Sequence, residues 1–211
     1  MVKNKGVNPW QEISKEDYLG HMSSYNVLQL QTLNKVLKDL IDFYHPNVFV
    51  YPGCTNGNGL EYLDSSIVEE IYAIDINEEY LEECRGSYSY FGDKLITIQC
   101  DFDIEKPMIG RCDLIHFALF LEYVEVFSAL EWAYNTLDMD GYISIIIQEN
   151  RGDMFVSKTK YTSLEELKTV SHTVKADDVL FFFAEKQMSL VWNKEIDLPA
   201  NKAFRWLLFR K

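Results

Sequence analysis

The stretch VFVYPGCTNGNG, residues 48–59, decides the fold of this chain. It predicts a short buried strand, Asn47 to Tyr51, followed by a glycine-rich turn and then by a helix that begins near Gly57. Glycine has no Cβ and tolerates positive φ, so such a turn lets backbone approach a ligand closely, and the free amides of a following helix would point at that ligand. The stretch therefore predicts a ligand site at the end of the first strand.

An acidic residue follows the second apolar run. Asp75 stands 22 positions after Gly53 and closes the run from Ile71 to Ile74. A carboxylate at this place can accept hydrogen bonds from both hydroxyls of a ribose. The alternative is an ordinary acid at a strand end, although Asn77 is better placed to cap the next helix. Strand, glycine turn, helix, strand and acid together predict the nucleoside-binding half of an open α/β sheet.

Strands and helices alternate from residue 47 onward, which predicts a mostly parallel sheet with helices on both faces. The last two strands are expected to form an antiparallel hairpin around DLPAN, residues 197–201. The further strands are predicted over residues 95–100, 113–119, 142–148, 188–196 and 202–209, and the further helices over residues 57–63, 77–91, 122–137 and 177–186.

The residues before the sheet are predicted to be helical. Residues 1–45 are expected to form an N-terminal helical cover or lid, and residues 46–211 a single compact α/β domain. A helix from about Ser23 to Tyr44 carries leucines along one face. Just before it, Tyr18 and His21 either belong to an amphipathic cover on the sheet or close over a bound ligand and exclude water.

Composition narrows the classes of function. The chain has 211 residues, a formal net charge of −13 and 47% hydrophobic residues, as expected of a folded globular domain. The acidic surface argues against a nucleic-acid substrate, because phosphate contacts require clustered Lys and Arg. No apolar run approaches the roughly 20 residues that span a membrane, and the polar start is no signal peptide, so a cytoplasmic protein is predicted. The four cysteines lack the spacing of a metal or disulfide framework and are expected to be buried free thiols.

The order of these elements resembles the class I S-adenosylmethionine-dependent methyltransferases. The resemblance covers about residues 45–211 and includes VFVYPGCTNGNG, YAIDIN, CDF, CDLIHFALFLEYV and LDMDGYISIIIQE. It implies a Rossmann-like fold with a seven-stranded, mostly parallel sheet and an antiparallel C-terminal strand pair. Two positions depart from the usual loop, since Tyr51 stands where the family has an acid and Thr55 replaces the middle glycine.

The resemblance also implies roles for particular residues. S-adenosyl-L-methionine would be the cofactor and S-adenosyl-L-homocysteine the product. Asp75 would bind the ribose hydroxyls and Asp101 the adenine amino group, with a turn formed by Asp101–Asp103 as the alternative. The other cofactor-binding candidates are Gly53, Cys54, Thr55, Gly57, Ile76, Phe102, Phe117 and Ala118.

Methyl transfer is an in-line displacement at carbon, and positioning the partners near 3 Å supplies much of the rate, about 7–11 kcal/mol. A base is needed only if the acceptor must lose a proton. The catalytic candidates are Glu122 and Tyr123, after the fourth strand, and Tyr18 and His21, from the cover. His116 is expected to pack within the sheet, and packing at a helix start is the alternative for Tyr123.

A small-molecule methyltransferase is thus the predicted function, and no metal and no oligomeric state are predicted. A catalytically degenerate methyltransferase fold that serves as a cofactor-binding or interaction module is the alternative, because the glycine loop is altered. A nicotinamide-dependent dehydrogenase is disfavoured, since Thr55 and Asn58 fall where its GxGxxG fingerprint requires glycine.

Overall fold

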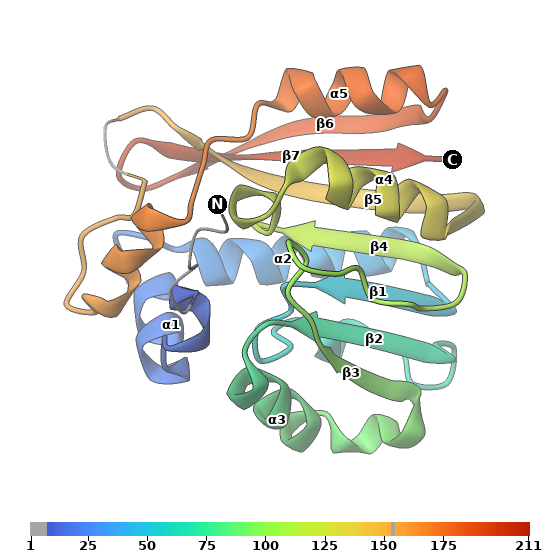
Figure 1. Cartoon of the computed structure of the whole chain (residues 1–211), viewed down its shortest axis with the longest axis horizontal. Helices are drawn as coiled ribbons and strands as arrows, with labels where there is room; N and C mark the ends of the chain where they lie inside the picture. Colours follow the sequence, from blue (N-terminus) through green and yellow to red (C-terminus); the bar gives the residue numbers. More distant parts are fainter. Residues whose placement is uncertain (1–7, 153–154) are drawn as a thin grey trace, which may run out of the picture.

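The computed structural model describes residues 8–152 and 155–211 of the chain, so residues 1–7 of the predicted N-terminal cover lie outside the described residues. Within this part the chain forms one seven-stranded sheet in the order β3-β2-β1-β4-β5-β7-β6 (Figure 1). The first five strands in this order pair in parallel, and β7 runs antiparallel to both β5 and β6. The strands are β1 Val48–Pro52, β2 Glu70–Asp75, β3 Leu95–Gln99, β4 Cys112–Ala118, β5 Leu137–Asn150, β6 Ser189–Leu198 and β7 Lys202–Arg210. The predicted fold class is confirmed.

Helices cover both faces of the sheet, as the alternation of elements predicted. The α-helices are α1 Lys15–Met22, α2 Gln29–Phe43, α3 Glu78–Ser87, α4 Val126–Thr136 and α5 Ala176–Glu185. Short 3-10 helices are η1 Pro9–Gln11, η2 Leu60–Tyr62, η3 Ser89–Lys94, η4 Leu121–Tyr123 and η5 Ser163–Thr169. Successive residues of a strand point to opposite faces. Accordingly, Phe49 of β1 packs in the core under α2 and α3, and Val50 in the core under α4 and α5. Both are fully buried, which explains the continuous apolar sequence of this central strand.

Two predicted helices differ from those in the structure. The helix predicted from Ser23 begins as α2 at Gln29, because Leu28 before it adopts left-handed backbone with φ 52°. The helix predicted over residues 122–137 is divided into the short η4 and α4. Glu125 caps α4 by accepting a hydrogen bond from the backbone N–H of Ser128 at 2.7 Å.

The helix predicted after the glycine-rich turn is absent from the described residues. Residues 55–59 form turns, and only the three-residue η2 follows them. Gly57 and Gly59 have φ values of 82° and 94°, which lie outside a right-handed helix. The prediction that helix amides point at a ligand here is therefore wrong.

Helix α1 and the connection after β5 lie side by side at one end of the sheet (Figure 1). The Ser163 hydroxyl donates a hydrogen bond to Asp17 of α1, and the Asn26 side chain donates to the carbonyl of Lys158 at 3.0 Å. The Tyr161 ring packs directly on Gly20, where a Cβ would lie 2.0 Å from it. The two segments are thus joined to each other. From here on, the cover means α1 together with this connection, in place of residues 1–45 alone. Residues 153–154 of the connection lie outside the described residues.

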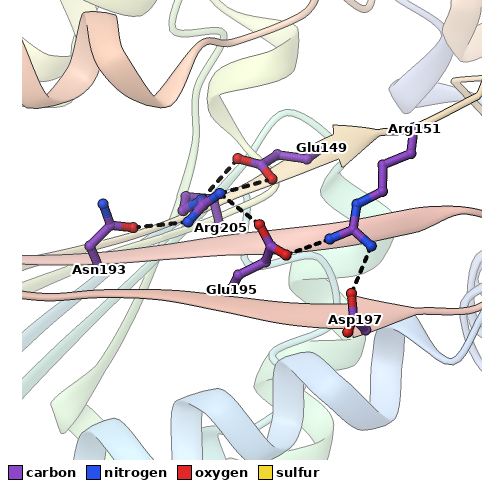
Figure 2. A network of polar contacts seen from close by, with 6 residues as sticks. All are labelled: Glu149, Arg151, Asn193, Glu195, Asp197 and Arg205. Atoms are coloured by element: carbon purple, nitrogen blue, oxygen red, sulfur yellow. Dashed lines mark hydrogen bonds and ion pairs between the residues drawn. The ribbon is translucent and has the colours of Figure 1, made fainter.

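An ion-pair network holds the C-terminal strands together (Figure 2). Arg205 of β7 donates to both carboxylate oxygens of Glu149 on β5, at 2.9 and 3.3 Å, and to Glu195 on β6 at 2.7 Å. Arg151 extends the network by donating to Glu195 at 2.5 Å and to Asp197 at 2.8 Å. Figure 2 shows that the Arg205 side chain lies between its two acidic neighbours, so it links three adjacent strands.

Across residues 8–152 and 155–211, no helix combines the length and the apolar character needed to cross a membrane.

Candidate active site

A cavity lies at the carboxyl ends of the parallel strands. The strand order reverses between β1 and β4, and ligands of open α/β sheets bind at such a point. Residues that end or follow four different strands line the cavity, among them Gly53, Asp75, Asp101 and Ala118. The cavity and its open mouth together contain about 1140 Å³ of empty space.

Asp75 is the acid in this cavity, and its carboxylate holds the glycine loop. Its two oxygens accept hydrogen bonds from the backbone N–H groups of Thr55 and Asn77, both at 2.9 Å. Burial raises the pKa of Asp75 to about 6, although these backbone donors oppose the rise. Asn77 caps α3, as the sequence suggested, by accepting from the N–H groups of Glu79 and Tyr80. Asp75 is therefore free of any capping role at that helix.

The glycine-loop candidates divide into two groups. Gly53 and Thr55 line the cavity, whereas Cys54 and Gly57 do not belong to its lining. Cys54 is fully buried, and a Cβ on Gly57 would lie 2.7 Å from the Cys84 sulfur, so Gly57 faces α3 and the core. Thr55 has a φ of 49°, so the residue in place of the family's middle glycine adopts left-handed backbone.

The ring of Phe120 lies over Gly53. A Cβ on Gly53 would be 2.6 Å from the Cδ2 atom of Phe120, and Gly53 itself has a φ of 68°. Phe120 also stacks on Phe117, with ring centroids 5.5 Å apart and planes 12° from parallel. Position 53 therefore requires glycine for two reasons: a Cβ would collide with Phe120, and residues with a side chain rarely adopt this positive φ.

The remaining cofactor candidates are also only partly brought together. Ile76, Asp101, Phe102 and Ala118 line the cavity. Phe117 does not, because it is fully buried in the core under α4 and α5. The Asp101 carboxylate accepts the backbone N–H of Asp103 at 2.9 Å, which is the turn contact considered as its alternative role.

Four aromatic rings in mutual contact, those of Trp10, Tyr18, Tyr123 and Phe155, line part of the cavity. The Tyr123 ring meets Trp10 edge-on at 5.0 Å and Phe155 at 6.2 Å. Tyr18 from the cover packs against Trp10 at 6.2 Å. Burial raises the pKa of Tyr18 to about 12, with the charge of Asp75 adding to the rise. Burial also raises the pKa of Tyr123, and the charge of Glu122 adds to that rise. The phenol groups of both tyrosines are therefore neutral at pH 7.

Glu122 is a buried carboxyl group in the cavity wall. Its side chain is 1% exposed. Its Oε1 accepts the backbone N–H of Gln148 at 2.7 Å, and its Oε2 has no hydrogen-bond partner among the residues that the structure describes. Burial raises the pKa of Glu122 to about 7. A carboxyl of this kind exchanges its proton near neutral pH, which suits it to accept a proton from a ligand.

Two basic side chains lie at the cover end of the cavity. His21 contacts the Thr159 hydroxyl through Nδ1 at 3.0 Å. Burial, and secondarily the charge of Lys202, lowers the pKa of His21 to about 4, so its imidazole is neutral at pH 7. Lys202 donates to the carbonyl of Phe155, and burial lowers its pKa to about 8.

Sequence reasoning missed several residues that line the cavity, including Trp10, Gln29, Phe120, Gln148 and Lys202. Lys202 could have been found, because a strand antiparallel to β5 begins at the edge where the parallel strands end. For Trp10, in contrast, no feature of the sequence predicted a position at the cavity. His116 is buried in the sheet as expected and contacts Ser144 at 3.0 Å through Nδ1, and it is not part of the cavity lining.

Comparisons with known proteins agree with this geometry. Residues 50–145 match the family model described as a methyltransferase domain. The fold is similar to that of the N-methyltransferase NodS from Bradyrhizobium japonicum WM9 in complex with S-adenosyl-L-homocysteine. That match has a TM-score of 0.69 and 15% identity over 97% of this chain and 98% of the other. A comparison of the sequence with curated proteins finds no match.

Two further solved structures share the fold. One is the Burkholderia thailandensis 1,6-didemethyltoxoflavin-N1-methyltransferase with bound 1,6-didemethyltoxoflavin and S-adenosylhomocysteine, with a TM-score of 0.66 and 14% identity over 100% of this chain and 93% of the other. The second is TehB from Haemophilus influenzae, with a TM-score of 0.65 and 18% identity over 94% and 67% of the two chains. The chain therefore has the class I fold of these solved methyltransferases, and residues 50–145 match the methyltransferase domain model, in agreement with the resemblance drawn from its sequence.

Proposed function

We propose that this protein is an S-adenosylmethionine-dependent methyltransferase that acts on a small molecule. The observation that carries the proposal is the cavity where the strand order reverses, with the carboxylate of Asp75 in its wall at the end of β2. A buried acid at this place is suited to the two hydroxyls of a ribose. The methyltransferase domain match over residues 50–145 supports the same class of reaction.

The residues at the strand ends fit the adenosyl part of this cofactor. Asp75 would accept from the ribose hydroxyls, because each of its oxygens accepts one backbone N–H and keeps a second lone pair. Ile76, Asp101 and Phe102 would surround the adenine, and Ala118 would lie beside the reacting carbon. When bound, the cofactor supplies a methyl group on a positively charged sulfur.

The methionine end of the cofactor would lie along Gly53 and Thr55. Phe120 packs over Gly53 where a Cβ would lie, and both residues line the cavity, so the Phe120 ring would form part of the wall at this end of the cofactor. Cys54, Gly57 and Phe117 face the core and are not proposed as contacts.

The acceptor would enter beneath the cover formed by α1 and the connection after β5. Tyr18, His21, Glu122 and Tyr123 line this end, and we assign them to acceptor binding and to exclusion of water. A cavity at the strand ends and a net charge of −13 support a small molecule over a nucleic acid. The four cysteines are free and buried, which supports a reducing compartment, so we place the protein in the cytoplasm.

Titration calorimetry tests the proposal, because S-adenosylhomocysteine should bind the wild type. In a separate unfolding experiment, S-adenosylhomocysteine at a hundredfold excess over its Kd should raise the free energy of unfolding by about 2.7 kcal/mol, whereas NADH should not change it. Asp75→Ala should weaken S-adenosylhomocysteine binding at least tenfold, since hydrogen bonds to a charged group contribute about 1.5–3 kcal/mol each.

Asp113→Ala is the matched control for Asp75→Ala. Asp113 likewise accepts two backbone N–H groups, those of Asn47 and Val48 at 2.8 and 3.0 Å, but it does not line the cavity. Its variant should lose stability and keep its affinity for S-adenosylhomocysteine. Equal loss of affinity in both variants would remove Asp75 from the site. Absence of any binding by the wild type would leave a non-catalytic module as the better interpretation.

A further inference from the structure

The second carboxyl oxygen of Glu122 is a feature that the proposed cofactor site does not use. Oε1 is fixed by the N–H of Gln148, whereas Oε2 has no partner among the described residues, and the side chain lines the cavity. Buried polar atoms are usually paired, because an unpaired one has lost its water without compensation. An unpaired acceptor in a cavity wall is therefore suited to a ligand that brings a donor.

The surroundings of Glu122 restrict the shape of that ligand. Trp10, Tyr123 and Phe155 pack edge-to-face beside it, which leaves flat apolar surfaces. The Glu122 carbonyl accepts the backbone N–H of His172 at 2.9 Å, and the neighbouring Tyr123 ring contacts Phe155, so Glu122 lies next to the connection after β5. This is the end of the cavity at which the acceptor is proposed to enter.

The other polar groups at this end do not compete for the role of proton acceptor. His21 is already in contact with Thr159, and burial keeps the pKa of its ring at about 4. Lys202 is a hydrogen-bond donor to the Phe155 carbonyl. The Gln29 amide donates to the Gln148 side chain at 2.5 Å, so both amides are already engaged.

We propose that the methyl acceptor is a flat, largely apolar molecule whose nucleophilic nitrogen or oxygen carries a hydrogen, and that Glu122 Oε2 binds this hydrogen and removes it as a proton. The proposal rests on the proposed methyltransferase function. The lone pair of the acceptor atom forms the bond to the methyl carbon while the carbon–sulfur bond breaks and its electrons neutralise the sulfonium. The proton leaves the acceptor for Glu122, which becomes a neutral acid and later releases it to water.

The burial that raises the pKa of Glu122 to about 7 supports this role, because a base works best when its pKa lies near the working pH. Glu122→Gln reverses the hydrogen-bonding character of this group. The amide oxygen must still accept from the N–H of Gln148, so the NH₂ group, a donor, takes the place of Oε2.

A matched pair of probes tests the proposal by calorimetry, without turnover. Indole and benzofuran have nearly the same shape, but only indole has an N–H donor. The wild type saturated with S-adenosylhomocysteine should bind indole about tenfold more tightly than benzofuran. Glu122→Gln should lose this preference, and so should Glu122→Ala, which serves if the first variant does not fold.

Glu165→Gln is the control, since it removes an exposed carboxylate on η5 that does not line the cavity, so it should keep the preference for indole. Equal binding of the two probes by the wild type would overturn the proposal, as would a preference that persists in both Glu122 variants. Binding of neither probe would overturn the assigned class of acceptor. If S-adenosylhomocysteine does not bind, the proposed function fails, and the probes alone then decide whether Glu122 recognises a donor.

Discussion

Replacing Glu122 with glutamine should stabilise the folded protein above neutral pH. Glu122 is 1% exposed, and burial raises its pKa from 4.5 to about 7. Its carboxylate ionises more easily in the unfolded chain than in the folded one. The free energy of unfolding therefore falls as pH rises from about 4.5 through about 7. The difference between the two pKa values corresponds to about 3 kcal/mol, all of which is lost above pH 7.

Glutamine carries no charge at any of these pH values and keeps the hydrogen bond to Gln148 N–H. Urea unfolding of the wild type and of Glu122→Gln should therefore give similar stabilities near pH 4.5. At pH 8 the variant should be the more stable by about 3 kcal/mol. Asp75 also loses stabilisation over this range, because its pKa is raised to about 6. Asp75 contributes equally in the wild type and in Glu122→Gln, so the difference between their free energies of unfolding reports on Glu122 alone.

Glu165→Gln provides the control, because Glu165 is exposed on η5 and its replacement should change the free energy of unfolding by no more than about 0.5 kcal/mol. Parallel pH profiles for the wild type and Glu122→Gln would refute the reasoning, since they would mean that the Glu122 carboxylate is no less solvated in the folded protein than in the unfolded chain. The same result would weaken the case for Glu122 as a proton acceptor.

Two further predictions concern stability. Gly53→Ala should destabilise the protein by at least about 1–2 kcal/mol in urea unfolding, because a side chain at a φ of 68° is strained and its Cβ would meet Phe120. Gly86→Ala, inside α3 with no atom within 4 Å of the new Cβ, should instead be neutral or stabilising by up to about 1 kcal/mol. Arg205→Ala removes the ion pairs to Glu149 and Glu195, which should lower the free energy of unfolding by about 1 kcal/mol and with it the melting temperature. The effect of the substitution should be smaller in 1 M NaCl, because salt screens exposed ion pairs. If salt does not change the stability lost in Arg205→Ala, then Arg205 stabilises the strands through packing of its side chain and not through its charge.

The sheet could be predicted from the sequence because its strands follow local patterns. Buried parallel strands appear as continuous apolar runs, and Asp75 ends one of them, so its position at the sheet edge followed from the chain itself. The sequence could not show which way the loop atoms point. Gly57 is a predicted cofactor contact that lies outside the cavity lining, and a Cβ at this position would point toward Cys84 of α3.

The pair Phe117 and Ala118 could have been separated by strand geometry alone. Neighbouring residues of a strand point to opposite faces, so only one of the two can face a given site. Ala118 lines the cavity and Phe117 lies in the core. In contrast, Trp10 reaches the cavity through contacts between distant parts of the chain, and no local periodicity predicts such contacts.

The altered glycine loop has a physical explanation in Asp75. Thr55 adopts left-handed backbone at a φ of 49°, which costs a residue with a side chain about 1–2 kcal/mol. Its N–H donates to the Asp75 carboxylate at 2.9 Å, and a hydrogen bond to a charged acceptor contributes about 1.5–3 kcal/mol. The two effects are of similar size, so the hydrogen bond to the carboxylate can offset the strain at Thr55. Since each Asp75 oxygen keeps a second lone pair, supporting the loop and binding a ribose do not exclude each other.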